Sequence, residues 1–332
     1  MRELFERTRA VGAQFGVVLV LMEGEGYEVA TFRTERGYAD GRHPGEVRFA
    51  GIEEDARRRD FTINGMYWDP VADELTDRVG GRSDLERGLI RAIGDAEERL
   101  REDRLRIVRA VRFAARLGFE IESETRRALE SLAPLVTDVA PERLQQELRI
   151  ILTDRDPAAA LRLMDDLGLL RDIFPEMEEA KGCEQPANYH PEGDVFVHSI
   201  LTVEKLGPHP DFVLAMAALL HDVGKPEASR DRPCEFPEHE QIGRDAAVGV
   251  CRRLRLPNAE TERIAWLVKR HMYFKDADKM RQSTLKRLFA EPGFEQLCAL
   301  VRADALASWG RMDHVEYVLA KREELSEEET CP

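Results

Sequence analysis

The sequence predicts an α+β fold with a small α/β head, a helical neck and an all-α C-terminal domain. Short apolar runs and alternating segments, which are typical of strands, occur only near the N-terminus, and from about residue 95 apolar residues recur at helical spacing. The 332 residues suffice for two or three compact units. We expect the head at residues 1–88, the neck at 89–185 and the C-terminal domain at 186–325.

The head is expected to contain a short helix, a β-hairpin and two short edge elements. The hairpin is predicted because an apolar run at 15–22 and an alternating segment at 27–32 flank a Gly-Glu-Gly turn. No strand is expected beyond residue 68. The other elements are a helix at 2–10, a Gly- and charge-rich loop at 36–44, and edge elements at 47–50 and 66–68.

Beyond the head, apolar periodicity predicts helices that continue almost to the end of the chain. In the first of them, Leu105, Val108, Val111 and Ala115 form an apolar stripe, and the arginines fall on the other side. Residues 186–193 are expected to form a linker. The helices are expected at 96–117, 123–133, 141–153, 157–167, 194–206, 211–222, 239–254, 258–271, 281–290, 293–307 and 311–325.

The net charge of −15 argues against indiscriminate electrostatic capture of nucleic acid, so RNA contacts must come from a local basic face. One stretch offers such a face. The alternative is a solvated helix whose arginines form intrahelical ion pairs with Glu97, Glu98, Glu102 and Asp103. The arginines of this stretch are Arg99, Arg101, Arg104, Arg106, Arg109, Arg112 and Arg116.

The five cysteines contain no CxxC pair, which indicates neither a disulfide framework nor a zinc cluster. This usage fits a reducing cytosol, and we expect a cytoplasmic protein. No apolar run reaches the roughly 18 residues of a membrane-spanning helix, and the N-terminus shows no signal-peptide pattern. No membrane partner is therefore expected.

The run RRDFTIN at residues 58–64 carries side chains that suit a nucleotide. Arg58 and Arg59 offer planar donor forks that match phosphate oxygens. Asp60 can hold one of these arginines or accept a hydrogen bond from a ribose hydroxyl, and the Asn64 amide is both donor and acceptor. A lone Arg-Arg-Asp run is common on protein surfaces, whereas the full run is more specific.

A second set of nucleotide-binding candidates lies in the expected neck helix. Asp103, Arg106 and Arg109 are three residues apart, so on one continuous helix they would project from neighbouring turns of one face. A carboxylate beside a guanidinium can match the Watson–Crick edge of C or A. The alternative is an intrahelical ion pair.

The C-terminal domain carries six potential metal ligands in sequence order. A lone buried histidine is usually a core residue, but an apolar run that ends in His-Asp-Val-Gly-Lys is a specific signal, and Lys225 adds a charge for a phosphate. Imidazole and carboxylate together suit divalent metals. His190 and His209 match no pattern and are expected to be loop residues. The six are His198, His221, Asp222, His239, His271 and Asp304.

RRDFTIN and the run EDRLRIVR at residues 102–109 resemble motifs of the tRNA nucleotidyltransferase (CCA-adding) and bacterial poly(A) polymerase family. The resemblance implies a class II nucleotidyltransferase head joined to a helical neck. It also implies that Asp103 and Arg106 contact the incoming base, and that Arg59, Arg109 and Arg112 contact the nucleotide phosphates or sugar. ATP, CTP and the 3′ end of tRNA or another RNA are the implied substrates.

The chain departs from this family in the part that holds catalytic metal. The resemblance makes Glu28 the counterpart of a third acidic residue, but no Gly-rich loop followed by Asp-x-Asp precedes it. The Asp-x-Asp spacings at 154–156 and 276–278 lie in helical regions and are interpreted as surface residues. Two Mg²⁺ ions support this chemistry, so their site is incomplete here. We expect a truncated nucleotidyltransferase α/β head; the alternative is an intact gene of which this chain is a part.

The histidine and aspartate pattern resembles the HD phosphohydrolase superfamily. That resemblance implies a site for a divalent metal such as Mn²⁺, Ni²⁺ or Mg²⁺, and a phosphatase or 2′,3′-cyclic phosphodiesterase activity on RNA ends or nucleotides. An Asp that directly follows a His at a helix end can bridge two metals.

Three hypotheses follow. The first is an RNA 3′-end nucleotidyltransferase with an HD domain, for which CCA addition and poly(A) addition both remain open. The second is metal-dependent phosphohydrolysis by the HD domain, with the head as an RNA platform. The third is an RNA-binding fragment without enzymatic activity.

Overall fold

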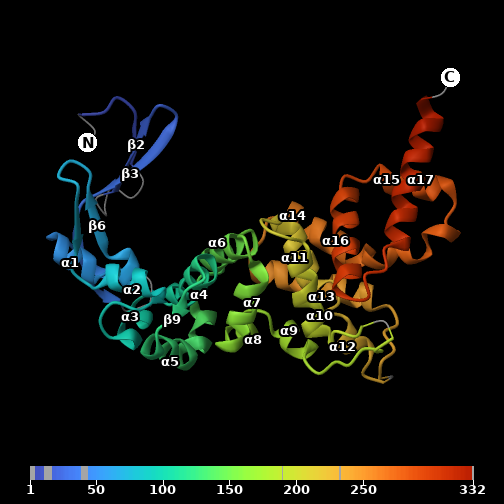
Figure 1. Ribbon diagram of the computed structural model, residues 1–332, viewed down its shortest axis with the longest axis horizontal. Coiled ribbons are helices and arrows are strands. Elements are labelled where there is room, and N and C mark those ends of the chain that lie inside the picture. The colour runs from blue at the N-terminus through green and yellow to red at the C-terminus, as the bar shows by residue number, and fades with distance from the viewer. Residues whose placement is uncertain (1–3, 11–16, 39–43, 189, 232, 331–332) are drawn as a thin grey trace. The chain divides into compact units, whose positions relative to one another are not determined.

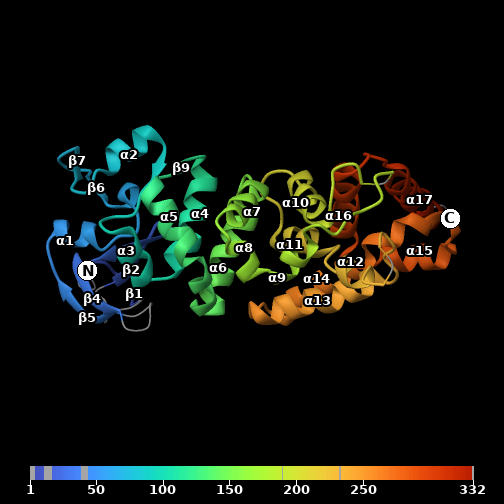
Figure 2. The same cartoon turned by 90° about the horizontal axis from the view of Figure 1, so that it is seen from below.

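The computed structural model describes residues 4–10, 17–38, 44–188, 190–231 and 233–330. The chain forms two compact units. The first comprises residues 1–106 and 119–132, and the second comprises 107–118 and 133–332. Figures 1 and 2 label the elements of both units along the chain.

The first unit begins with a three-stranded antiparallel sheet in the order β1-β2-β3. Its strands are β1 Thr8–Ala10, β2 Val17–Met22 and β3 Glu25–Ala30. The predicted hairpin is confirmed: Glu23 and Gly24 take positive φ between β2 and β3. The start of the apolar run, residues 15–16, lies outside the described residues.

The helix expected at 2–10 is wrong over the described residues of that range, because 4–7 are irregular and 8–10 form β1 instead. These residues pair with the centre of β2, where Thr8 lies opposite Val20. So short a segment has little helix stability of its own. Pairing with a neighbouring strand therefore decides its conformation.

Strands also extend beyond the expected ranges. β4 Arg33–Tyr38 pairs with β5 Pro44–Phe49, so the ends of the loop expected at 36–44 are strand, and residues 39–43 lie outside the described residues. The expectation that β structure ends near residue 68 is wrong. Three very short strands, which show little periodicity, lie beyond residue 68. β7 Glu74–Asp77 pairs with β6 Met66–Asp69, which lies at the edge element expected at 66–68, and β8 Leu89–Ile90 pairs with β9 Glu120–Ile121.

Short helices complete the first unit around a small core. Phe61, Ile90, Leu100 and Leu129 are fully buried there. The short elements α1, η2 and α2 were not predicted from periodicity because each is two turns or shorter. The helices are α1 Ile52–Arg57, η2 Thr62–Asn64, α2 Gly81–Arg87, α3 Ala96–Glu102 and α5 Ser123–Leu132.

The single helix expected at 96–117 is in fact two helices. α3 ends at Glu102, and α4 Leu105–Leu117 begins after an extended residue, Asp103, with φ −141° and ψ 103°. The Asp103 carboxylate accepts a hydrogen bond from the backbone N–H of Leu105 at 3.2 Å, and its carbonyl accepts one from Arg106 N–H at 2.9 Å. Asp103 therefore stabilises the start of a new helix, as aspartate commonly does.

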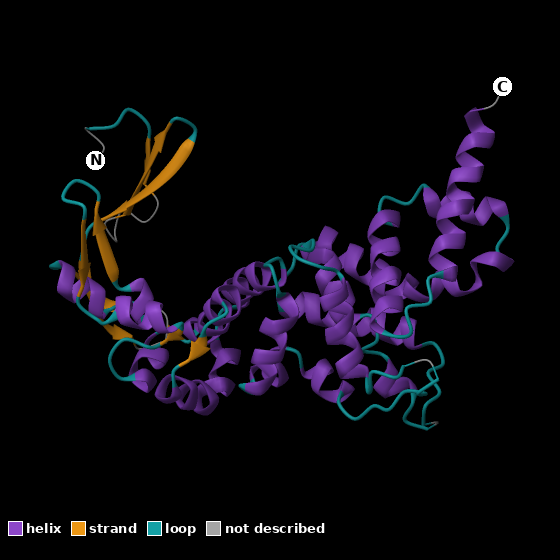
Figure 3. Cartoon of the chain, viewed as in Figure 1, coloured by secondary structure: helices purple, strands orange, loops and turns teal. Residues whose placement is uncertain are grey.

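All regular secondary structure among the described residues of the second unit is helical (Figure 3). Every helix predicted from residue 123 onward is present, and no end is displaced by more than five residues. Besides most of α4, the unit contains η3 Ala133–Asp138, α6 Pro141–Leu152, α7 Pro157–Asp166, α8 Leu169–Ile173, α9 Pro175–Ala180, α10 Val195–Lys205, α11 Phe212–Leu220, α12 Lys225–Ala228, α13 His239–Arg253, α14 Asn258–Arg270, η4 His271–Lys279, α15 Gln282–Phe289, α16 Phe294–Ala307 and α17 Asp313–Thr330.

The apolar helix α11 is the centre of the second unit. It packs against α10, α14 and α16, and eight of its nine residues are buried. A helix that is apolar on all sides is stable only when neighbours cover it all round. Its C-terminal end, where His221 and Asp222 follow, is consequently held in the interior.

Close backbone packing beside this end predicts the effect of two glycine substitutions. A Cβ on Gly224 would lie 2.2 Å from the carbonyl oxygen of His239 and 2.5 Å from the amide nitrogen of Gly243. We expect Gly224→Ala to lower the free energy of unfolding by about 1–3 kcal/mol through overpacking. Gly249→Ala on α13 meets no atom within 4 Å and should raise it by roughly 0.5–1 kcal/mol. Denaturant unfolding measures both; equal effects would contradict the packing argument.

Candidate metal centre and nucleotide-binding residues

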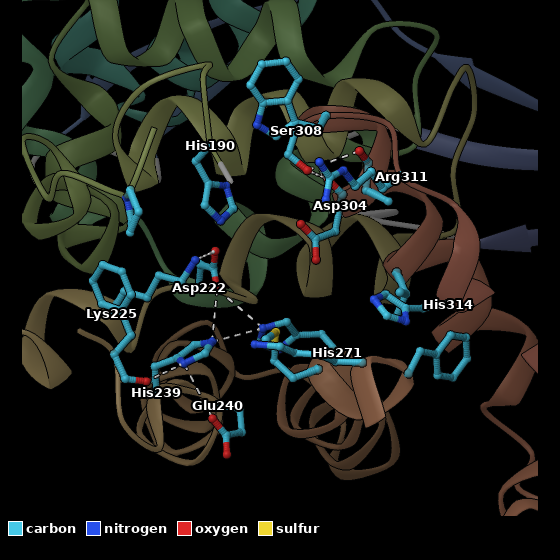
Figure 4. Close-up of a pocket in the computed structure, with 18 of the residues that line it drawn as sticks. His190, Asp222, Lys225, His239, Glu240, His271, Asp304, Ser308, Arg311 and His314 are labelled. Carbon is cyan, nitrogen blue, oxygen red and sulfur yellow. Dashed lines mark hydrogen bonds and ion pairs between the residues drawn. The ribbon is translucent and has the colours of Figure 1, made fainter. Parts of the chain in front are cut away.

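The six ligands predicted from sequence converge in the second unit. Figure 4 labels four of them: Asp222, His239, His271 and Asp304. His221 and Asp222 follow the end of α11, and His198 comes from the interior of α10. His239 begins α13 and His271 begins η4, while Asp304 lies on α16. All of the histidines and Asp222 are buried.

The first group of ligands consists of His198, His221 and Asp304, whose ligand atoms lie within 4.8 Å of one another. The Nε2 atom of His198 is 3.0 Å from Asp304 Oδ1 and 3.3 Å from His221 Nε2. We call these three residues the first triad.

The second triad consists of Asp222, His239 and His271, also within 4.8 Å. Asp222 Oδ1 is 3.5 Å from Nε2 of both histidines, whose Nε2 atoms are 3.3 Å apart. The other oxygen, Oδ2, is 3.3 Å from Nε2 of His221 in the first triad. One carboxylate thus faces both triads, which is the bridging arrangement expected for Asp222.

Hydrogen bonds assign the nitrogen that each histidine presents to the centre. Nδ1 of His221 lies 2.8 Å from a backbone carbonyl, and the corresponding distances are 2.9 Å for His239 and 2.7 Å for His271. A carbonyl only accepts, so Nδ1 carries the proton and Nε2 of the neutral ring presents a lone pair. Two lone pairs facing each other at 3.3 Å repel unless a proton or a metal ion lies between them.

Charge also favours cations at this centre. Glu192 and Asp304 flank His198, and Lys225 Nζ is 2.6 Å from Asp222 Oδ2. Metal ligation requires neutral histidines, and these three carboxylates and one ammonium then carry two net negative charges. Asp222 Oδ1 is buried and forms no hydrogen bond within the described part of the chain. The donor set therefore fits divalent cations, which lower the pKa of bound water and stabilise charge on a phosphoryl group.

Burial and partners shift the pKa values of these groups in opposite directions. Burial lowers the pKa of His198, but hydrogen bonds with Asp304 and Glu192 outweigh burial and raise it to about 9. Burial raises the pKa of Asp222, but the charges of His221 and Lys225 hold it well below its ordinary value. Burial lowers the pKa of His239. The carboxylates are thus ionised and able to bind cations.

A cavity of about 700 Å³ opens onto the centre and contains the side chains a phosphoester would need. Cationic Lys225, Lys275 and Arg311 line it, together with the indole of Trp309. Lysine and arginine donate to phosphate oxygens, and an exposed indole can stack on a nucleobase.

Two further residues, His190 and Glu192, also lie beside this site, although no sequence motif identifies them. His190 is a loop residue as expected, but it lines the cavity, and its Nδ1 is 2.9 Å from Glu192 Oε1. A carboxylate and a histidine two residues apart, just before the His198 helix, were the available signal. His209 is an exposed loop residue, as predicted.

In the first unit, a buried aspartate that the motif analysis missed holds the RRDFTIN arginines. Asp55 is 1% exposed; its Oδ1 accepts from Arg58 at 2.6 Å, and its Oδ2 accepts from Arg59 at 3.1 Å and Tyr67 at 2.6 Å. Burial raises the Asp55 pKa, but hydrogen bonds from Tyr67, the Arg33 N–H and Arg58 outweigh it and lower the pKa. The signal was the helical spacing of Asp55 three and four residues before the arginines.

The polar residues at the end of this motif shape the local chain. The Asp60 carboxylate accepts from the backbone N–H of Phe61 at 2.9 Å and from the Asn64 amide at 3.0 Å. Asp60 is buried. These bonds fix the turn that carries η2.

The neck arginines divide between two kinds of partner. Arg106 is 8% exposed and donates to the Arg99 carbonyl, Glu102 and the Arg58 carbonyl at 2.7–3.0 Å. The pair of Arg106 with Glu102 thus joins α4 to α3, whereas an intrahelical ion pair of the kind considered from sequence is present within α3, between Arg101 and Glu97. The prediction that Asp103 shares a continuous helical face with Arg106 and Arg109 is wrong, because the helix breaks at Asp103.

Arg109 and Arg112 pair instead with a carboxylate from another helix. Glu147 of α6 is 6% exposed and lies 3.6 Å from Arg109 and 3.1 Å from Arg112. Both guanidinium groups also lie over the ring of Phe113, at 5.3 and 4.5 Å from its centroid. In the sequence, Glu147 could have been noticed as an acidic residue within the apolar stripe of α6.

Glu28, the expected catalytic carboxylate, lies on β3 opposite Leu19 of β2, and its side chain is exposed. Of the two Asp-x-Asp pairs, Asp156 accepts from the Ala159 N–H at the start of α7, and Asp276 pairs with Lys279 at 2.6 Å. Both pairs thus have local structural contacts, in line with the interpretation as surface residues.

Family models match three parts of the chain. Residues 1–91 match the poly A polymerase head domain, and residues 118–181 match a probable RNA and SrmB-binding site of polymerase A. Residues 195–309 match the HD domain.

A multifunctional CCA protein of Stenotrophomonas maltophilia is 38% identical over 298 residues, which cover 84% of this chain and 70% of that protein. The chain belongs to the tRNA nucleotidyltransferase family, with a C-terminal HD domain. The CCA-adding enzyme of Lactiplantibacillus plantarum is 46% identical over 162 residues, covering 48% of this chain and 40% of that enzyme. This family of RNA 3′-end nucleotidyltransferases was predicted from the two motifs.

Solved structures agree. The Bacillus stearothermophilus CCA-adding enzyme in complex with CTP is similar over 98% of this chain and 70% of that chain, with a TM-score of 0.65 and 27% identity. The α+β fold class is confirmed. Among the described residues, no helix combines the length and the apolar character needed to cross a membrane.

The Asp55 network predicts a pH-dependent stability. A carboxyl pKa lowered on folding stabilises the protein above the unfolded value of about 3.9, and this stabilisation is lost as pH falls through the folded pKa. Asp55→Asn should lower the free energy of unfolding at pH 7 by about 1.5–3 kcal/mol, with a smaller difference below pH 4. Urea unfolding at several pH values measures this.

Glu53→Gln is the matched control on the same helix. Glu53 pairs with Arg57 in an exposed ion pair at 2.7 Å, so its loss should cost less than about 1 kcal/mol. A deficit of Asp55→Asn that does not change with pH, or one equalled by Glu53→Gln, would contradict the assignment.

Proposed function

We propose that this chain recognises CTP and ATP and acts at the 3′ end of tRNA, in CCA addition. The observation that carries the proposal is the pairing of arginines on buried carboxylates: Arg58 and Arg59 on Asp55, and Arg109 and Arg112 on Glu147. Each carboxylate holds two guanidinium groups in place, and guanidinium donor forks match phosphate oxygens. The names of the relatives favour CCA addition over poly(A) addition.

The proposed division of labour follows the three expected domains. The head at 1–88 and the neck at 89–185 bind the nucleotide and RNA, and the domain at 186–325 holds the metal centre. The matches to head, RNA-binding and HD models support these boundaries. Glu28 would contribute one carboxylate toward Mg²⁺. Asp60 and Asn64 would hold the motif in the shape that presents Arg59.

Nucleotide binding tests this proposal. Arg59→Ala should weaken CTP and ATP binding equally, by about tenfold or more, because a guanidinium that contacts phosphate does not discriminate between bases. Asp103→Asn keeps a hydrogen-bond acceptor for the Leu105 N–H but replaces one oxygen by a donor. It should change the CTP-to-ATP affinity ratio without changing the melting temperature. Isothermal titration calorimetry in Mg²⁺ measures both affinities.

Arg57→Ala is the matched control, since Arg57 precedes the pair and its side chain is 67% exposed. Its nucleotide affinities should stay within about twofold of the wild type. If Arg57→Ala weakens binding as much as Arg59→Ala does, binding is a matter of general charge and the proposed site is wrong.

We propose metal-dependent phosphohydrolysis of RNA ends or nucleotides as a second function, carried by the two triads bridged through Asp222. Mn²⁺, Ni²⁺ or Mg²⁺ would be held by His198, His221 and Asp304, and by Asp222 with His239 and His271. The cavity cations would bind the phosphate oxygens and orient the ester toward the triads.

His221→Ala should lower phosphatase and 2′,3′-cyclic phosphodiesterase turnover by at least about a hundredfold, and nucleotide affinity at the head should not change. Chelation of the wild-type protein should abolish the activity, and added Mn²⁺ should restore it, which shows that the loss is not unfolding. His209→Ala, an exposed loop change, is the control. Activity that survives chelation would exclude this function.

A further inference from the structure

The carboxylate of Glu192 is buried beside the metal centre but belongs to neither triad. Its side chain is 7% exposed, and Oε1 lies 2.5 Å from Nδ1 of His198 and 2.9 Å from Nδ1 of His190. The second oxygen is buried and has no hydrogen-bond partner among the described residues. Burial of a carboxylate costs free energy, so a compensating interaction is expected here.

A comparison with the other three histidines of the triads shows what the contact of Glu192 with His198 replaces. His221, His239 and His271 each have Nδ1 against the backbone carbonyl three residues earlier, those of Ala218, Phe236 and Val268. Each lies at a helix end, where such carbonyls are available.

His198 lies inside α10, where the intrahelical hydrogen bonds occupy the carbonyls of the preceding turn. Its Nδ1 meets Glu192 instead. Glu192 thus occupies, for His198, the place that a backbone carbonyl occupies for the other three histidines.

We propose that Glu192 is a positioning residue for the metal centre: it accepts the Nδ1 proton of His198 and so directs the Nε2 lone pair toward the first triad. The proposal rests on the phosphohydrolase function proposed above. A carboxylate in this place also raises the basicity of the ring it orients. Since the same oxygen meets Nδ1 of His190, Glu192 ties the cavity wall that carries His190 to the metal centre.

A competing arrangement uses the same atoms. His190, Glu192 and His198 lie close enough to hold a metal themselves. That site would take Nδ1 of His198 as a ligand and move the proton to Nε2, which is 3.0 Å from Asp304 Oδ1 and 3.3 Å from His221 Nε2. It would remove His198 from the first triad. The two arrangements therefore differ in whether His190 is needed for metal.

Calorimetric titration of the metal-free protein with Mn²⁺ tests the proposal without turnover. Glu192→Ala should weaken Mn²⁺ binding by about 10–100-fold, the range for loss of a group that orients a ligand. Glu192→Gln should weaken it less, because the amide oxygen still accepts the Nδ1 proton. Both variants should melt at the wild-type temperature without metal, and Glu192→Ala should lose most of the Mn²⁺-induced rise in melting temperature.

Glu240→Gln is the matched control. Glu240 lines the same cavity and lies 3.6 Å from Nδ1 of His239, but that nitrogen already donates to the Phe236 carbonyl. The change removes one negative charge from the cavity and no bond that fixes a tautomer. Its Mn²⁺ affinity, and that of His190→Ala, should stay within about threefold of the wild type.

Three results would overturn the proposal. The first is an Mn²⁺ affinity of Glu192→Ala within about twofold of the wild type. The second is a loss of Mn²⁺ affinity in Glu240→Gln as large as that in Glu192→Ala. The third is an equal loss in His190→Ala, which would make Glu192 a ligand of a separate site. Wild-type protein that binds no Mn²⁺ would overturn the phosphohydrolase function together with this inference, so the two failures are distinguishable.

Discussion

The structure depends above all on buried carboxylates that are shared between several partners. Asp55, Glu147 and Asp222 are each less than a tenth exposed, and each contacts at least two cationic or imidazole side chains. An unpaired carboxylate in such a place would cost several kcal/mol. The partners, among them Arg58, Arg59, Arg109 and Arg112, are therefore held in place by the same interaction that makes burial possible.

This constraint reconciles an acidic protein with anionic substrates. The net charge of −15 opposes approach of RNA at long range, but close to the surface only local charge matters. Asp55 and Glu147 each hold two arginines in place, and guanidinium groups match phosphate oxygens. At the metal centre, the carboxylates favour divalent cations, and the cavity cations beyond them favour phosphate.

Local residues carried most of what could be predicted. The apolar run of α11 and the His-Asp pair after it indicated a buried helix that ends at a metal centre, because a helix that is apolar all round must be covered on every side. The longer helices were predictable because periodicity accumulates over several turns. β1, β7, β8 and β9 were not, since each has four residues or fewer, too short for a pattern of its own, and is held by pairing with another strand.

The sequence by itself determined the family and the α+β class, because these follow from residue types at fixed spacing, and the resemblance that its motifs carry predicted the six ligands and the arginines. Only the tertiary structure decided which partners orient them. The break at Asp103, the hold of Glu147 on Arg109 and Arg112, and the approach of Glu192 to His198 each depend on where the chain turns or which elements meet in space. Helical spacing cannot show this, because a hydrogen bond across a fold depends on distance in space and not on distance along the chain.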